Sequence, residues 1–276
     1  MKKVIRGTRY YIEPYHKSDS LPVLVMLHGF LGSSGSFFHL TDALANIANV
    51  VLIDLIGHGE TESPAEPERY SPGEQTSDLK EILGSFTHSP VILHGYSMGG
   101  RLALMFARRH PQLLKGLILE STTAGIPDQG ERAKRKKLDR KRAMQILEDK
   151  ERFINEWNRS AIFQNKFAMP TDLQQQLEAI QQAQNSIGLQ NSLLGFGTGA
   201  MPALHEYLDD ILLPTLILSG DHDSKFTEEG RKLSERIPNS THTEISDSSH
   251  RIHLDNPEAY LAAIREFILK LVDQPD

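Results

Sequence analysis

The chain has 276 residues, a formal net charge of −6 and no cysteine. The missing cysteines exclude disulfides and cysteine-based metal sites, and the acidic balance argues against general nucleic-acid binding. No uninterrupted stretch of about 18 apolar residues occurs, which excludes a membrane-spanning helix. Because no apolar segment follows the charged N-terminus, we expect no secretion signal and a cytoplasmic protein.

Short apolar runs recur along the chain, each followed by glycine or polar residues and then by a helical pattern. An alternating segment at residues 8–13 predicts an antiparallel edge strand. Buried strands are predicted at residues 22–27, 49–55, 91–93, 116–120, 214–218 and 241–245, before a closing amphipathic helix at 259–272. Such alternation is typical of an α/β fold whose mostly parallel sheet is covered by helices on both faces.

Residues 122–212 break this rhythm. The segment is charged, rich in glutamine and helical in its apolar spacing, with no strand signal. It opens directly after a strand, at the edge of the sheet where ligands bind in such folds. We therefore expect an inserted helical lid at 122–212, between core parts at 1–121 and 213–276. The alternative is a helical subdomain without a role at the site.

Ser97 lies in a Gly-x-Ser-x-Gly motif between an apolar run and a helical segment. In a tight strand-to-helix turn, side chains at Gly95 and Gly99 would clash with their surroundings. The turn lifts the serine hydroxyl out of the sheet and sets it at a helix N-terminus. This context predicts a nucleophile elbow, with a plain strand-to-helix turn as the alternative.

A nucleophilic serine needs an imidazole, and the imidazole needs a carboxylate that fixes its tautomer. On this fold the chain order is serine, aspartate, histidine. Asp221 and Asp223 both follow a late strand, and Asp223 is favoured because Asp221 stands where a turn-capping aspartate is expected. His250 and His253 both follow the last strand. His250 is preferred because it is nearer the strand end, which leaves His253 to packing or a supporting hydrogen bond.

Backbone amides near the serine are predicted to form an oxyanion hole. On this fold the loop after the first buried strand supplies one N–H group and the residue after the nucleophile supplies the other. These donors would be Phe30 and Met98. A further glycine-rich turn contains His58 and follows Asp54, and we interpret both residues as structural.

Several basic residues point to an anionic substrate. Arg101 lies one helical turn beyond Ser97 on the same face, which favours anion binding at the base of a pocket. Residues 131–142 are strongly basic although the chain is acidic. Most of these side chains are expected to be solvated, but one inward arginine would form an anion clamp. Trp157 either lines the pocket or anchors the packing of the lid.

Taken together, these motifs resemble the α/β-hydrolase superfamily over nearly the whole chain. Within it, the chain is most similar to the 2-succinyl-6-hydroxy-2,4-cyclohexadiene-1-carboxylate synthases of menaquinone (vitamin K2) biosynthesis. The motifs that carry the resemblance are His28-Gly29-Phe30, Gly95-Tyr96-Ser97-Met98-Gly99-Gly100-Arg101, Glu131-Arg132-x-x-Arg135-x-x-x-Asp139, Gly220-x-x-Asp223-Ser224-Lys225-Phe226 and His250.

The resemblance implies a lyase that eliminates pyruvate from a small tricarboxylate, 2-succinyl-5-enolpyruvyl-6-hydroxy-3-cyclohexene-1-carboxylate. Proton abstraction would be carried out by Ser97, His250 and Asp223, without a metal or an organic cofactor. The resemblance also implies that the substrate is contacted by Tyr96, Arg101, Arg135 and Trp157.

One position departs from the family pattern. Some relatives place a further lid arginine where this chain has Gln181, so a neutral amide or a different cation would hold one carboxylate. The alternative functions are a carboxylesterase or carbon–carbon hydrolase with the same catalytic residues, and a non-catalytic receptor on this fold. For partners we expect a small molecule, no nucleic acid, no membrane insertion, and a monomer or weak homo-oligomer.

Overall fold

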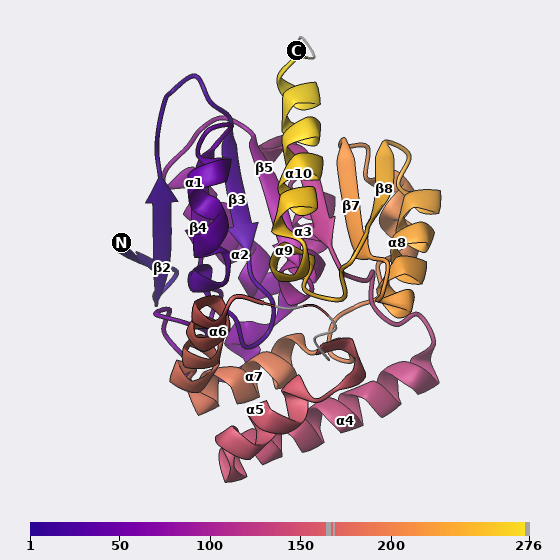
Figure 1. The fold of residues 1–276 in the computed structure, drawn as a ribbon. Helices are drawn as coiled ribbons and strands as arrows, with labels where there is room; N and C mark the ends of the chain where they lie inside the picture. The colour runs from indigo at the N-terminus through magenta and orange to yellow at the C-terminus, as the bar shows by residue number, and fades with distance from the viewer. Residues whose placement is uncertain (164–166, 168, 274–276) are drawn as a thin grey trace.

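The computed structural model describes residues 1–163, 167 and 169–273. Within these residues the centre is an eight-stranded sheet of order β1-β2-β4-β3-β5-β6-β7-β8 (Figure 1). The strands are β1 (Lys2–Ile5), β2 (Thr8–Tyr15), β3 (Val23–Leu27), β4 (Asn49–Ile53), β5 (Val91–Tyr96), β6 (Leu114–Glu120), β7 (Thr215–Gly220) and β8 (Ser240–Ile245). Strands β3 to β8 are parallel, which confirms the predicted α/β architecture.

The edge of the sheet differs from the prediction. The strand expected at the edge, β2, pairs with β4 on one side and with the additional strand β1 on the other. Strand β1 is short and half of it is lysine, so it carries no apolar alternation. A two-residue turn joins the strands, with φ of 44° at Arg6 and 83° at Gly7. Positive φ at both positions is the geometry that favours tight hairpins.

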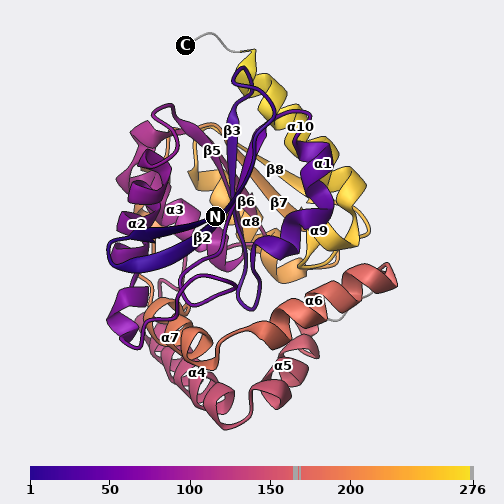
Figure 2. The same cartoon turned by 90° about the vertical axis from the view of Figure 1, so that its left-hand side faces the viewer.

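Helices cover both faces of the sheet (Figure 2). One face carries α2 (Pro72–Gly84), α3 (Met98–Arg109) and α8 (Ser224–Arg236), and the other carries α1 (Thr41–Leu44), α9 (Ile252–Asp255) and α10 (Pro257–Val272). Each side has its own apolar core, with Leu102 and Phe106 of α3 in one and Tyr260 and Ile264 of α10 in the other. The short 3-10 segments are η1 (Ser34–Leu40), η2 (Pro67–Tyr70), η3 (Pro111–Leu113), η4 (Ala161–Phe163) and η5 (His205–Asp210).

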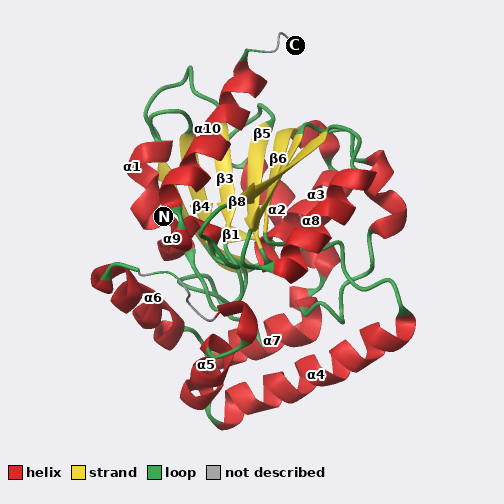
Figure 3. Ribbon diagram, turned by 45° about the vertical axis from the view of Figure 1, so that its right-hand side comes forward, coloured by secondary structure: helices red, strands yellow, loops and turns green. Residues whose placement is uncertain are grey.

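Four helices between β6 and β7 lie together beyond the carboxyl ends of the parallel strands (Figure 3). They are α4 (Gln129–Glu148), α5 (Lys150–Asn158), α6 (Thr171–Ala183) and α7 (Ser186–Phe196). Side chains of Asp128, Asp149 and Asn185 cap α4, α5 and α7 by accepting from backbone amides. A separate apolar cluster joins three of these helices, so the segment has a small core of its own. None of the described helices is both long and apolar enough to cross a lipid bilayer.

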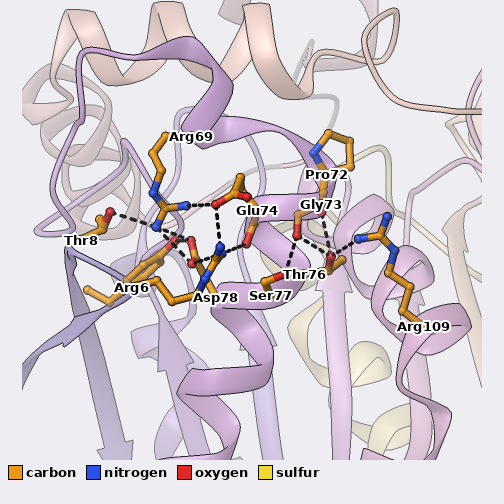
Figure 4. A network of polar contacts seen from close by, with 11 residues as sticks. Arg6, Thr8, Arg69, Pro72, Gly73, Glu74, Thr76, Ser77, Asp78 and Arg109 are labelled. Atoms are coloured by element: carbon orange, nitrogen blue, oxygen red, sulfur yellow. Dashed lines mark hydrogen bonds and ion pairs between the residues drawn. The ribbon is translucent and has the colours of Figure 1, made fainter.

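A buried acid fixes the N-terminal hairpin to α2 (Figure 4). The side chain of Asp78 is 1% exposed and forms ion pairs of 3.0 Å with both Arg6 and Arg69. The hydroxyl of Tyr10, on β2, donates to the same carboxylate at 2.6 Å. The hairpin is thereby held against α2 on the side of the sheet away from the β7–β8 end.

The close approach of α3 to β3 requires a residue without a side chain at position 99. A Cβ atom at this residue would lie 2.3 Å from the carbonyl oxygen of Leu27, which is backbone and cannot move aside. We expect Gly99→Ala to lower the free energy of unfolding by about 3 kcal/mol or more, and Tm by about 6 °C or more. Gly84→Ala is the matched control, since its Cβ would meet nothing within 4 Å. Equal melting temperatures for the two variants would contradict this packing.

Candidate active site

Ser97 stands at the junction of β5 and α3 in a strained conformation. Its φ of 50° and ψ of −102° are unusual for a residue with a side chain. Two hydrogen bonds from the end of β6 hold it there. The Ser97 amide donates to the carbonyl of Glu120 at 2.8 Å, and the Thr122 hydroxyl donates to the carbonyl of Ser97 at 2.8 Å. The strand–turn–helix arrangement expected from the motif is present.

Three side chains singled out in the sequence meet at this turn. His250 Nε2 lies 3.1 Å from Ser97 Oγ, and His250 Nδ1 lies 2.7 Å from Asp223 Oδ2. The second carboxylate oxygen of Asp223 accepts from the Phe226 amide at 3.3 Å, which fixes its orientation. With a proton on Nδ1, His250 donates to the carboxylate and its Nε2 accepts from the serine hydroxyl. This is the geometry that activates a serine hydroxyl.

The two competing residues occupy other places. Asp221 is exposed and accepts from the Ser248 amide at 3.1 Å, so it caps the loop before His250. His253 Nδ1 lies 2.6 Å from Glu120 Oε1, and its backbone amide donates to the same oxygen at 3.2 Å. Neither residue is within hydrogen-bond distance of Ser97.

Glu120 is the centre of a buried polar cluster that the sequence analysis did not identify. It is fully buried, and its Oε2 lies 3.2 Å from His94 Nε2, which in turn lies 2.9 Å from the Tyr260 hydroxyl. Burial acts to raise the pKa of Glu120, but the facing His253 and His94 outweigh it and hold the pKa at about 2. The feature of the sequence that could have revealed this role is a charged residue, Glu120, at the end of an otherwise apolar strand.

The depressed pKa of Glu120 predicts acid sensitivity. Its ordinary value is 4.5, so as the pH falls from about 5 towards 2 the unfolded chain takes up the proton first. The stabilisation is therefore present above pH 4.5 and is lost as the pH falls towards about 2. We expect Glu120→Gln to lower the free energy of unfolding at pH 7 by about 3 kcal/mol, because histidine partners lose their charged acceptor. Its Tm should also fall less steeply below pH 5 than that of the wild type, and parallel curves would rule out this role.

Both predicted oxyanion donors border the same cavity as Ser97. Met98 is the first residue of α3, so its amide has no acceptor within the helix. Phe30 follows β3, in a loop fixed by His28. The Nδ1 of His28 donates to the Gly29 carbonyl at 2.7 Å. Among the described residues, neither the Phe30 nor the Met98 amide donates to a protein acceptor, so both are available to a ligand.

His28 is held neutral in this loop. Its Nε2 accepts from the Leu55 amide at 3.0 Å, and burial lowers its pKa to about 4.

Asp54 has the structural role that the sequence favours. Its two carboxylate oxygens accept from the amides of Ser34 at 2.6 Å and Glu60 at 2.8 Å. His58 is buried with its ring 5.2 Å from that of His28.

A cavity of about 290 Å³ lies between Ser97 and the helices α4, α5 and α7. Its wall carries Ser97 and His250 on the core side. It also carries four cationic side chains, Arg101, Arg135, Arg142 and Lys225. Such a concentration of positive charge in a concave site favours an anionic ligand, because guanidinium groups bind carboxylates through paired N–H donors.

Arg101 is the most buried of these cations, at 8% exposed. It donates to the carbonyl of Phe196 at 2.7 Å and lies over the ring of the same residue. Burial lowers the pKa of Arg101, and the nearby charge of Arg135 acts in the same direction. Arg135 itself is held by Asp139 at 2.7 Å. The neighbouring positive charges are therefore unfavourable for one another, and a bound anion would relieve this repulsion.

Arg142 and Lys225 were not named as binding residues from the sequence. Arg142 follows Arg135 by two helical turns and so shares its face of α4, a spacing that the basic run contained. Its guanidinium lies 5.1 Å from the Trp157 ring centroid. Trp157 lines the cavity and also packs edge-on against Phe30 at 5.2 Å, so both roles considered for it are met.

Tyr96 does not line this cavity. It lies on a smaller adjacent one of about 40 Å³, together with Gln181 and Arg251. Phe30 and Phe163 border both cavities. A substrate confined to the main cavity would not reach Tyr96, in contrast to the contact that the family resemblance implies.

Comparison with known proteins places this site in a family. The family described as alpha/beta hydrolase fold matches residues 22–257. A Bacillus subtilis (strain 168) protein with the provisional name 2-succinyl-6-hydroxy-2,4-cyclohexadiene-1-carboxylate synthase is 36% identical over 96% of both chains. The chain belongs to the α/β-hydrolase family, within the group of these synthases.

Further relatives agree with this assignment. The synthase of that name from Escherichia coli (strain K12 / DH10B) is 27% identical over 92% of this chain and 96% of its own length. The solved structure of MenH from S. aureus superimposes with a TM-score of 0.90 at 33% identity, covering 94% of this chain and 98% of that one. The predicted family resemblance is thus confirmed along almost the whole chain.

Proposed function

We propose that the protein is a lyase that eliminates pyruvate from 2-succinyl-5-enolpyruvyl-6-hydroxy-3-cyclohexene-1-carboxylate, giving 2-succinyl-6-hydroxy-2,4-cyclohexadiene-1-carboxylate. One observation carries the proposal. The hydrogen-bonded set of Ser97, His250 and Asp223 opens onto a cavity that also exposes four cationic side chains. This arrangement suits proton abstraction from a polyanion. The names of the similar proteins contain the product of this reaction, which supports the choice of polyanion.

In this proposal Ser97 and His250 act together as the base. His250 accepts the serine proton, and the serine oxygen removes a proton from the ring carbon beside the succinyl carbonyl. Asp223 holds the imidazole in the required tautomer and stabilises its charged form. The electron pair of the broken C–H bond forms a new C=C bond in the ring, the existing ring C=C bond shifts by one position, and the C–O bond to the enolpyruvyl group breaks. The leaving group takes a proton and departs as pyruvate, and the base is restored.

The Phe30 and Met98 amides serve the charge that develops during this step. As the proton leaves, negative charge moves onto the succinyl carbonyl oxygen. Two amides without protein acceptors, beside the base, are positioned to receive it. Donors fixed in advance in a site that excludes water lower a barrier more than the same groups would in solution. No metal or organic cofactor is needed for any of these steps.

The cations of the cavity serve the substrate's carboxylates. The substrate carries three, and Arg101, Arg135, Arg142 and Lys225 offer charge-assisted donors from α3, α4 and α8. Because Arg101 is buried without a carboxylate partner among the described residues, its charge is best balanced when the substrate is bound.

Removing the proposed base should abolish turnover. We expect Ser97→Ala and His250→Ala to lower kcat for pyruvate release by about 10³-fold or more, and Asp223→Asn to lower it strongly. Pyruvate release is measured with a coupled dehydrogenase, with circular dichroism to confirm folding. His253→Ala provides the comparison, since it removes an imidazole that does not reach Ser97. Near-normal turnover in His250→Ala with loss in His253→Ala would show that the base is His253.

Removing a cavity cation should weaken binding more than chemistry. We expect Arg101→Ala and Arg135→Ala each to raise KM by about tenfold or more, since a hydrogen bond to a charged group contributes about 1.5–3 kcal/mol. The loss should shrink as ionic strength rises. Lys137→Ala, an exposed lysine of α4, is the control and should leave KM unchanged. Unchanged kinetic constants in both arginine variants would remove the anion-binding argument.

A further inference from the structure

The small cavity beside the main one has a polar side of its own. It lies between the loop after β3, the lid helix α6 and the start of α9, and its polar wall includes Tyr96, Gln181 and Arg251. Arg251, Gln181 and Phe163 also line an outer cleft of about 520 Å³. The small cavity, of about 40 Å³, therefore shares part of its lining with a larger cleft.

Arg251 directly follows His250 and is half-buried. Its guanidinium lies 4.5 Å from the ring centroid of Phe163 and donates to Asn158 Oδ1 at 3.1 Å. Among the described residues, no carboxylate lies within ion-pair distance of it. Arg135, whose side chain is 27% exposed, is instead paired with Asp139 at 2.7 Å. A guanidinium has five N–H donors, so most of those on Arg251 are open to a ligand.

Tyr96 brings a second donor to the same cavity. Its ring is fixed between His250 and His253, with centroid distances of 5.6 Å and 4.8 Å. Among the described residues its hydroxyl has no hydrogen-bond partner. Burial raises the pKa of the Tyr96 phenol, and the positive charge of Arg251 opposes the rise. The phenol is thus a neutral O–H donor close to an arginine charge.

Gln181 lies beside Arg251 in the lining of the small cavity. Its amide makes a reciprocal pair with Asn158, at 2.7 Å and 3.1 Å, and Asn158 also accepts from Arg251. The neutral amide of Gln181 and the guanidinium of Arg251 therefore both bind Asn158 and lie next to one another. The charge at this corner of the site comes from the loop after β8 and not from α6.

We propose that Arg251 and Tyr96 form a second carboxylate site, which binds the terminal carboxylate of the substrate's succinyl chain. The inference rests on the proposed function. The succinyl carbonyl is assigned to the amides of Phe30 and Met98, and Phe30 borders the small cavity. The terminal carboxylate is two methylene groups further along the chain. With the carbonyl held at Phe30, this carboxylate passes the aromatic wall of Phe30 and Phe163 and reaches Arg251.

The site predicts a binding defect that depends on one carboxylate. Arg251→Ala should raise KM for pyruvate release by about tenfold or more with kcat changed less than about threefold, and Arg251→Lys should recover part of the loss. Against a substrate analogue with the succinyl carboxylate converted to a primary amide, wild type and Arg251→Ala should have equal KM. Arg265→Ala, an exposed arginine of α10, should match the wild type.

A purely structural role makes different predictions. Arg251 also links the loop after β8 to α5 through its hydrogen bond to Asn158. If Arg251 acted only through this link, Asn158→Ala would cause the same defect as Arg251→Ala. We expect Asn158→Ala to keep KM within about twofold of the wild type, since the carboxylate donors remain. An unchanged KM in Arg251→Ala, or the same defect in Asn158→Ala, would overturn the proposal.

Failure of the proposed function is distinguishable from failure of this site. If the wild type releases no pyruvate, the lyase assignment fails, and the site is judged by binding of free succinate. Protection of the wild type against thermal unfolding by succinate, absent in Arg251→Ala, would retain the carboxylate site. Equal protection of both proteins would reject it.

Discussion

The site depends on the strained backbone of Ser97. A serine with φ of 50° is retained only where its surroundings determine it, and here they come from the end of the neighbouring strand β6. The amide and carbonyl of Ser97 are both bound by the end of β6, through Glu120 and Thr122. This places the hydroxyl above the sheet, at the beginning of α3. The positions of the imidazole, the amide donors and the cavity follow from that point.

Glu120 connects this turn to the loop that carries the histidine. Its carbonyl holds the backbone of Ser97, and its carboxylate holds His253, three residues after His250. The two reacting groups of the proposed base are therefore supported through a single buried residue. The distance of 3.1 Å between Ser97 Oγ and His250 Nε2 is the result of supports that converge from the sheet and from α9.

Local sequence patterns predicted most elements of the α/β core, because each pattern reflects a physical requirement that acts within a short stretch of the chain. A tight turn requires glycines around Ser97, and parallel strands buried on both faces must be continuously apolar. Strand β1 was missed because two lysines in four residues leave no apolar pattern. Asp223 and His250 followed from chain order and loop position.

Features formed by segments that lie far apart in the sequence could not be predicted from local patterns. The Glu120–His253 pair joins residues 133 positions apart, and Arg251 meets Asn158 across 93 positions. The sequence showed a basic lid segment, but only the packing of α4 against the core decides that Arg135 and Arg142 line the cavity while Lys137 is exposed. Tyr96 lines the small cavity because of the orientation of its ring, which no sequence motif predicts.

In the proposed mechanism, Ser97 serves proton abstraction from a polyanion and not acyl transfer. The most direct measurement compares wild-type kcat/KM for pyruvate release from the cyclohexene substrate with that for cleavage of p-nitrophenyl acetate. We expect one pyruvate for each substrate consumed, with a kcat/KM at least about 10³-fold above that for the ester. Rapid ester cleavage without pyruvate release would contradict it.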